Sequence, residues 1–182
     1  DDAHGLGVLG GGRGSAFEYE PRPRIDVQMG TLSKAVGAYG GFVAASRPVV
    51  DLVRTRARSL IYSTGLPPPV VAAAIAGLDI IAAEPGRAAA VLAKARRFTA
   101  ALGLPTAESA IVPIVLGESE TALSASAALA ERGFLVTAIR PPTVPQGTAR
   151  LRVTLSAGHD DRDIDRLVDA VATLGLVRPP LR

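Results

Sequence analysis

The lysine at position 34 stands in a short polar turn, Thr31-Leu32-Ser33-Lys34, between two apolar stretches that are typical of strands. A lysine can act as a nucleophile when its amine is neutral, and neighbouring hydroxyls can hold phosphate oxygens. The turn is therefore a candidate active-site loop, although a solvated loop lysine fits the same residues. The phosphate-binding pattern GxxxxGK[ST] is absent. The chain's other lysine, Lys94, suggests no role.

Asp1 and His4 are a second candidate, because a carboxylate and an imidazole lie three residues apart. A carboxylate can keep a pyridinium nitrogen protonated, and an imidazole can hydrogen-bond a phenolic oxygen. A metal site is the alternative, but two ligands without a third nearby are weak support for one. No metal is expected, and the absence of cysteine excludes thiolate ligands and thiol nucleophiles.

Residues 5–14, GLGVLGGGRG, contain the GxGxxG spacing of a dinucleotide-binding turn. That function requires a preceding strand and a helix that follows at once. The next residues, 15–24, are polar and include two prolines, so a structural glycine loop is the favoured interpretation.

Arg150 and Arg152 alternate with leucines, which predicts a strand with both guanidinium groups on one face. Arginine is the favoured bidentate partner of a carboxylate, so this face could bind an acidic ligand. A solvated strand face is the alternative.

The elements that must position these residues fall into three parts. Residues 1–66 are predicted as strands and loops, residues 67–102 as two helices, and residues 103–178 as a β-α-β-loop-β-α unit. Strands are expected over 25–29, 40–45, 110–116, 134–139 and 149–156, helices over 49–58, 70–83, 87–102, 119–132 and 159–176, and an extended segment over 59–66.

Composition narrows the classes of function. The 182 residues are 48% hydrophobic with a net charge of +3, which excludes a disordered chain. Basic clusters and aromatic residues are too sparse for nucleic-acid binding. The longest apolar stretch, residues 70–83, is shorter than the about 20 residues of a membrane-spanning helix, and no signal peptide is visible. We expect a cytoplasmic protein with no nucleic-acid or membrane partner, and the missing initial Met suggests a piece of a longer chain.

Four segments in a fixed order carry a family resemblance: DDAHGLGVLGGGRG, DVQMGTLSKAVGAYGGFVA, LIYSTGLPPP and VTAIRPPTVPQGTARLRVTLSAGH. Together they resemble the α-oxoamine synthases, α/β pyridoxal-phosphate enzymes of fold type I. The resemblance covers almost the whole chain, but only the C-terminal half of such an enzyme. It implies that residues 1–66 are the C-terminal part of the cofactor-binding large domain, residues 67–102 a helical link, and residues 103–182 a complete small α+β domain.

The resemblance assigns the cofactor ligands. Lys34 would bind pyridoxal 5'-phosphate covalently and act as acid and base, Asp1 would ion-pair with the pyridine nitrogen, and His4 would hydrogen-bond the phenolic oxygen. Thr31 would bind the phosphate.

Other assignments concern the phosphate and the substrates. Ser63 and Thr64, in the family's YST motif, would approach the phosphate across a dimer interface. Arg152 would bind the carboxylate of the amino acid, and Thr143 would line the acyl-substrate site.

The implied reaction is a decarboxylative condensation of L-alanine with pimeloyl-CoA or a pimeloyl-carrier protein, giving 8-amino-7-oxononanoate for biotin synthesis in a homodimer. Glycine C-acetyltransferase and other α-oxoamine synthases share these motifs. A catalytically incompetent fragment is a further alternative, because the N-terminal half is absent. The faces that this half would cover are then expected to be apolar.

Overall fold

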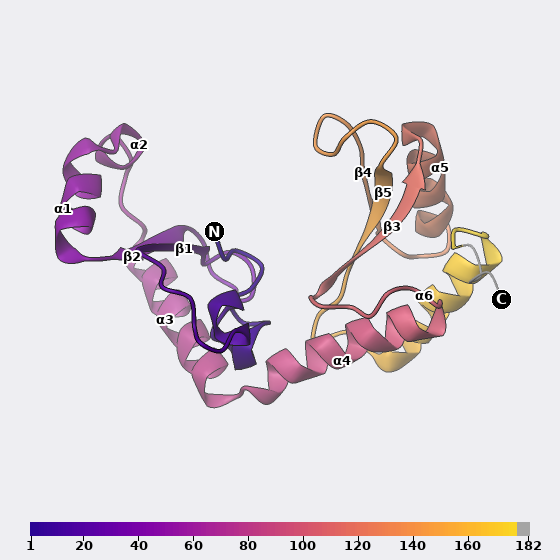
Figure 1. The fold of residues 1–182 in the computed structure, drawn as a ribbon, viewed down its shortest axis with the longest axis horizontal. Helices are drawn as coiled ribbons and strands as arrows, with labels where there is room; N and C mark the ends of the chain where they lie inside the picture. The colour runs from indigo at the N-terminus through magenta and orange to yellow at the C-terminus, as the bar shows by residue number, and fades with distance from the viewer. Residues whose placement is uncertain (178–182) are drawn as a thin grey trace. The chain divides into compact units, whose positions relative to one another are not determined.

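The structure, a computed structural model, describes residues 1–177 (Figure 1). The chain divides into two compact units, Asp1–Ala89 and Ala90–Arg182. The helical link expected over 67–102 is divided between them, because one of its two helices lies in the first unit and most of the other lies in the second.

The first unit is built on two antiparallel strands. Strand β1, Val27–Thr31, pairs with β2, Gly41–Ala45, and residues 32–40 connect the two. Figure 1 shows this hairpin beside helix α3, Pro68–Ala83. The other elements of the unit are the 3-10 turns η1, Gly10–Gly12, and η2, Ser15–Glu18, and the helices α1, Arg47–Arg56, and α2, Arg58–Ile61.

The first unit buries little apolar surface. Its buried hydrophobic residues are Val36 and three alanines, Ala16, Ala74 and Ala88, among the residues that the structure describes. Fifteen of the eighteen large hydrophobic side chains that are exposed in the described chain belong to this unit. The first unit therefore has exposed apolar side chains, as the sequence analysis expects. They include Val27 and Met29 on β1, Val43 on β2, and Val71, Ile75, Leu78 and Ile80 on α3.

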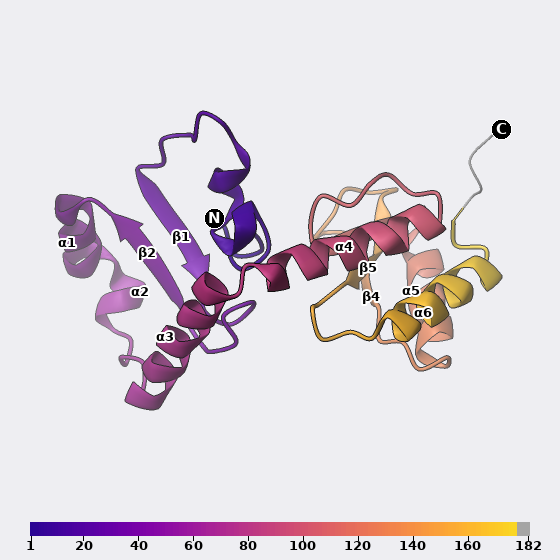
Figure 2. The ribbon, with the colours of Figure 1, turned by 90° about the horizontal axis from the view of Figure 1, so that it is seen from below.

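The second unit is a three-stranded antiparallel sheet with helices (Figure 2). Its strand order is β3-β5-β4, and the β-α-β-loop-β-α order of the sequence prediction is confirmed. The elements are α4, Gly86–Ala101, β3, Ile111–Gly117, α5, Ser119–Ala130, β4, Thr137–Ile139, β5, Ala149–Thr154, and α6, Asp161–Thr173.

One hydrophobic core holds the second unit together. It joins one face of the sheet to α4, α5 and α6, and its largest fully buried side chains include Phe98, Leu129, Leu151 and Ile164. Along β5, residues 149, 151 and 153 are buried while residues 150, 152 and 154 are not. An antiparallel sheet with one packed and one open face gives this alternation. The two arginines of β5 therefore lie on the open face, as predicted.

Two local predictions are wrong. Residues 58–61 form a helical turn instead of an extended segment, with the amides of Leu60 and Ile61 donating to the Ala57 carbonyl. The strand expected over 134–139 is shortened to Thr137–Ile139. Its first residue, Phe134, donates its amide to Leu129 and closes α5, next to Gly133 at φ +86°.

No single helix within residues 1–177 is long and apolar enough to cross a membrane. Helices α3 and α4 reach the length and hydropathy of a membrane span only when they are taken together, and the chain bends between them.

Candidate active site

The turn that carries Lys34 begins where β1 ends. The Leu32 amide donates to Gly40 and the Ala38 amide donates to Leu32, so the connection 32–40 is closed at its base. The ammonium of Lys34 lies 3.4 Å from the Thr31 hydroxyl, and the Lys34 side chain is exposed. The structure thus brings these two predicted site residues together in a hydrogen-bonded loop.

The glycine loop and α3 pack closely against this turn. A Cβ built on Gly7, at φ +77°, would lie 2.4 Å from the Cβ of Ala35, and one built on Gly77 would lie 2.3 Å from the Val36 carbonyl oxygen. Real Cβ atoms essentially never approach so closely, so a larger residue would force a shift. The loop leads into short 3-10 turns instead of a long helix, as expected of a structural loop.

The first residues of the chain lie beside β1, because the Asp2 amide donates to the Met29 carbonyl at 2.8 Å. Asp1 is exposed and its carboxylate accepts the Ala3 amide at 2.9 Å. His4 is also exposed. Both predicted cofactor ligands therefore lie on the surface of the first unit, and Asp1 directly precedes the residue that hydrogen-bonds the strand leading to Lys34.

The neighbouring acid, Asp2, has a structural role that the sequence analysis missed. Its carboxylate accepts the Ser15 hydroxyl at 2.6 Å and the Ser15 amide at 3.0 Å. Gly5 and Gly14 pass so close to this carboxylate that a Cβ on either would clash with it. Gly5 and Gly14 at the two ends of the loop were the available signal, because they leave room for the partly buried Asp2 carboxylate.

Ser63 and Thr64 follow α2 and are exposed. The Ser63 hydroxyl donates to the Leu60 carbonyl at 2.8 Å. A Cβ built on Gly40 would lie 3.0 Å from Leu66, so the segment carrying these hydroxyls passes the end of the lysine connection.

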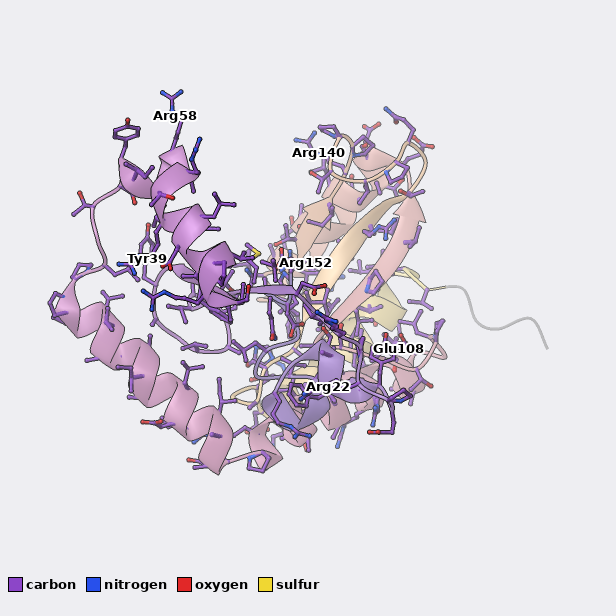
Figure 3. The ribbon with its side chains drawn as sticks, turned by 60° about the vertical axis from the view of Figure 1, so that its left-hand side comes forward. Arg22, Tyr39, Arg58, Glu108, Arg140 and Arg152 are labelled. Atoms are coloured by element: carbon purple, nitrogen blue, oxygen red, sulfur yellow. The ribbon has the colours of Figure 1, made fainter. Side chains whose placement is uncertain are left out.

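In the second unit, Arg152, labelled in Figure 3, is exposed on the open face of the central strand. It lies opposite Pro113 of β3 and Thr137 of β4. Arg150 lies opposite Ile139, at the start of the loop 140–148. That loop carries the exposed Thr143, so both predicted substrate-binding residues lie in one unit, on adjoining elements.

No cluster of three His, Cys, Asp or Glu side chains that could hold a metal ion occurs within the described part of the chain. The chemistry offered near Lys34 is that of an amine with hydroxyls, a carboxylate and an imidazole in the same unit. These are groups that bind an organic cofactor or substrate.

Comparisons with known proteins agree on one family. Residues 1–171 match the family model described as aminotransferase class I and II. Over 171 residues the chain is 61% identical to 8-amino-7-oxononanoate synthase of Methylocella silvestris, covering 94% of this chain and 49% of that protein.

Two solved structures are similar across nearly the whole chain. A serine palmitoyltransferase from S. paucimobilis with a bound PLP-myriocin aldimine gives a TM-score of 0.86 at 31% identity, covering 97% of this chain and 48% of that one. The 8-amino-7-oxononanoate synthase of Francisella tularensis gives 0.79 at 25% identity, covering 96% and 53%. The chain spans about half the length of the curated relatives it matches.

Proposed function

Because the chain belongs to the class I and II aminotransferase family and has its α/β fold, we propose that it acts in a pyridoxal-phosphate-dependent acyltransferase of the α-oxoamine synthase type. The reaction is the decarboxylative condensation of L-alanine with pimeloyl-CoA or a pimeloyl-carrier protein to 8-amino-7-oxononanoate. One observation carries the proposal, namely 61% identity to an 8-amino-7-oxononanoate synthase over residues that include the lysine turn.

The groups around Lys34 fit a phosphate-bearing aldehyde. The amine is exposed, the Thr31 hydroxyl lies 3.4 Å from it, and the backbone around the turn is packed too closely at Gly7 and Gly77 for side chains to intrude. Among residues 1–177, no three His, Cys, Asp or Glu side chains lie close enough together to hold a metal ion. An organic cofactor held by an amine is therefore the simplest occupant.

Each cofactor ligand has a distinct proposed task. Pyridoxal phosphate, when bound, supplies a ring that withdraws electrons from the amino-acid Cα. Lys34 holds the cofactor covalently and moves the proton at that carbon, while Asp1 stabilises positive charge on the pyridine nitrogen. His4 hydrogen-bonds the phenolic oxygen. The Thr31 hydroxyl donates to the phosphate, with further hydroxyls from Ser63 and Thr64.

The proposed substrate ligands are those implied by the family resemblance, and the exposure of Arg152 on β5 and of Thr143 on the preceding loop supports them. Arg152 binds the amino-acid carboxylate through its planar pair of donors. Thr143 lines the acyl site from the adjoining loop. Residues 1–66 serve as part of the cofactor-binding domain, residues 67–102 as a link, and residues 103–182 as the small domain.

The proposal includes a cytoplasmic homodimer. The exposed large apolar side chains of the first unit support further protein cover, because burying apolar surface away from water is favourable. The relatives are about twice as long, so the rest of such a chain and a second copy are the proposed cover.

Turnover assays distinguish the substrates. Thiol release from pimeloyl-CoA is measured with L-alanine, glycine and L-serine, and from acetyl-CoA and palmitoyl-CoA with each amino acid. The proposal expects the fastest release with L-alanine and pimeloyl-CoA. Preference for glycine with acetyl-CoA would overturn it, whereas L-serine with palmitoyl-CoA would favour the activity named for the similar serine palmitoyltransferase.

The incompetent-fragment alternative has its own outcome. If pyridoxal phosphate binds at Lys34 but no pair of substrates is turned over, the chain retains the cofactor site without the activity. If the cofactor does not bind, both the activity and the cofactor assignment fail.

A further inference from the structure

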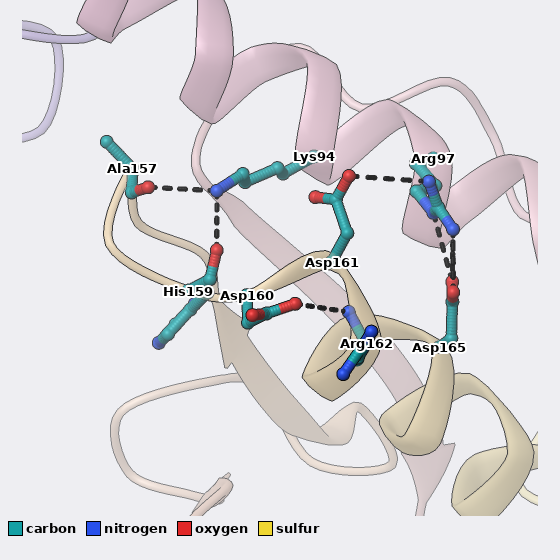
Figure 4. A network of polar contacts seen from close by, with 8 residues as sticks. All are labelled: Lys94, Arg97, Ala157, His159, Asp160, Asp161, Arg162 and Asp165. Atoms are coloured by element: carbon teal, nitrogen blue, oxygen red, sulfur yellow. Dashed lines mark hydrogen bonds and ion pairs between the residues drawn. The ribbon is translucent and has the colours of Figure 1, made fainter.

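Lys94 is the second of the chain's two lysines, and the proposed reaction gives it no task. It lies half-buried on α4. Its ammonium donates to the carbonyl of Ala157 at 2.8 Å and to that of His159 at 2.5 Å (Figure 4). Both acceptors belong to the connector 155–160, which joins the end of β5 to the start of α6.

The connector has few other bonds that fix its shape. The Ser156 amide donates to the ring of His159 at 3.2 Å, and the His159 amide donates back to Ser156 at 3.3 Å. Most of its residues are exposed, including Gly158. The Lys94 ammonium is a charged donor that contacts two backbone carbonyls, and hydrogen bonds with a charged partner are stronger than neutral ones.

A guanidinium on the same helix fixes the helix that follows the connector. Arg97 makes a two-pronged contact with Asp165, at 2.6 and 3.0 Å, and lies 3.5 Å from Asp161. The hydrogen bond and the charge of Asp165 raise the pKa of Arg97 above its ordinary value. Arg97 therefore binds the beginning of α6 to α4. Lys94 binds the connector between β5 and α6 to the same helix.

The strand that ends at this connector carries Arg152. Its partner on one side is Pro113, which has no N–H to donate at that position. Downstream of the ladder, the Leu155 amide donates to the Ala110 carbonyl at 2.8 Å. Beyond Leu155, the Lys94 ammonium provides a hydrogen bond from another helix of the second unit to the connector.

We propose that Lys94 is a positioning residue for Arg152, acting through the connector 155–160 on the end of β5, which lies two residues beyond Arg152. The inference rests on the proposed function, in which Arg152 binds the amino-acid carboxylate. Loss of the Lys94 ammonium lets the connector and the strand end move, so the guanidinium meets the carboxylate less often in the correct geometry.

Steady-state kinetics of Lys94→Met, Lys94→Arg, Arg152→Met and the double variant with methionine at both positions test this. Lys94→Met is expected to raise KM for L-alanine about threefold to tenfold, with kcat and KM for the thioester changed less than about twofold. Lys94→Arg keeps a charged donor and is expected to leave KM for L-alanine at the wild-type value. In the Arg152→Met background, Lys94→Met adds no further change. The control is Arg87→Met, which removes a cation of the same helix that pairs with Glu84.

Three outcomes would overturn the inference. In Lys94→Met, KM for L-alanine could stay unchanged, or kcat and both KM values could worsen by the same factor. In the double variant, the increases in KM for L-alanine from the two single variants could multiply. If Arg152→Met itself leaves KM for L-alanine unchanged, the proposed role of Arg152 fails instead. Amide hydrogen exchange needs no turnover. Residues 153–160 must exchange faster in Lys94→Met but not in Lys94→Arg, and equal exchange in both variants contradicts the contact's role.

Discussion

Gly7 and Ala35 approach so closely that a Cβ built on Gly7 would lie 2.4 Å from the Cβ of Ala35. Ala35 follows Lys34 directly, so the glycine loop packs against the turn that carries the lysine. Gly7 also has φ +77°, a conformation that side-chain-bearing residues rarely adopt. The loop whose spacing imitates a dinucleotide fingerprint thus supports the candidate catalytic lysine.

Gly7→Ala is expected to destabilise the chain more than Gly11→Ala. Gly11 has a similar φ of +64° but nothing within 4 Å of its added Cβ, so it isolates the backbone strain. We expect about 1 kcal/mol for Gly11→Ala and about 1–3 kcal/mol more for Gly7→Ala, which adds the clash with Ala35. Urea denaturation measures both, and equal losses would show that the close approach has no energetic weight.

Asp2→Ala is expected to lower the free energy of unfolding by about 1–3 kcal/mol, because the Ser15 amide and hydroxyl lose their acceptor. Asp1→Ala removes an exposed carboxylate and is expected to change stability by less than about 0.5 kcal/mol while weakening cofactor binding. Thermal denaturation and titration with pyridoxal phosphate separate these effects. If Asp1→Ala lowered stability and Asp2→Ala weakened cofactor binding instead, Asp1 would be the structural acid and Asp2 the cofactor ligand.

Leu151→Ala and Arg152→Met change neighbouring residues on opposite faces of β5. Leu151 is fully buried, so its truncation is expected to cost about 2–5 kcal/mol through lost contacts and the cavity left behind. Arg152→Met is expected to leave stability within about 0.5 kcal/mol and to raise KM for L-alanine. Chemical denaturation of both variants measures the contrast, and a large stability loss in Arg152→Met would argue for a structural arginine.

Arg97→Met is expected to loosen the start of α6, since it removes the paired contact with Asp165. Faster amide exchange in residues 161–165 is the expected result, with Arg166→Met as the control because Arg166 pairs with Asp163 of the same helix. Unchanged exchange at these amides would mean that the ion pair does not hold the helix.

Local patterns predicted much of the second unit. The alternation in β5 placed Leu151 and Arg152 on opposite faces, and Gly133 marked the end of α5. The helical turn at Arg58–Ile61 was missed because Ile61 and Tyr62 favour strands, whereas the segment folds back onto the end of α1 through Ala57.

The roles of adjacent acids could not be predicted from residue type. Asp1 and Asp2 are chemically identical, and their difference arises from Ser15, which is far along the chain from both. The contact of Lys94 with the connector also joins segments widely separated in sequence. Such pairings depend on tertiary packing, which spacing within one segment does not reveal.

Covalent trapping of the cofactor tests the central claim most directly. The protein is incubated with pyridoxal phosphate, reduced with borohydride and mapped by peptide mass spectrometry, with Lys34→Ala and Lys94→Ala as a matched pair covering both lysines. The account predicts one adduct, at Lys34, which is lost in Lys34→Ala and retained in Lys94→Ala. An adduct at Lys94 or at the N-terminal amine alone, or no adduct, would contradict it.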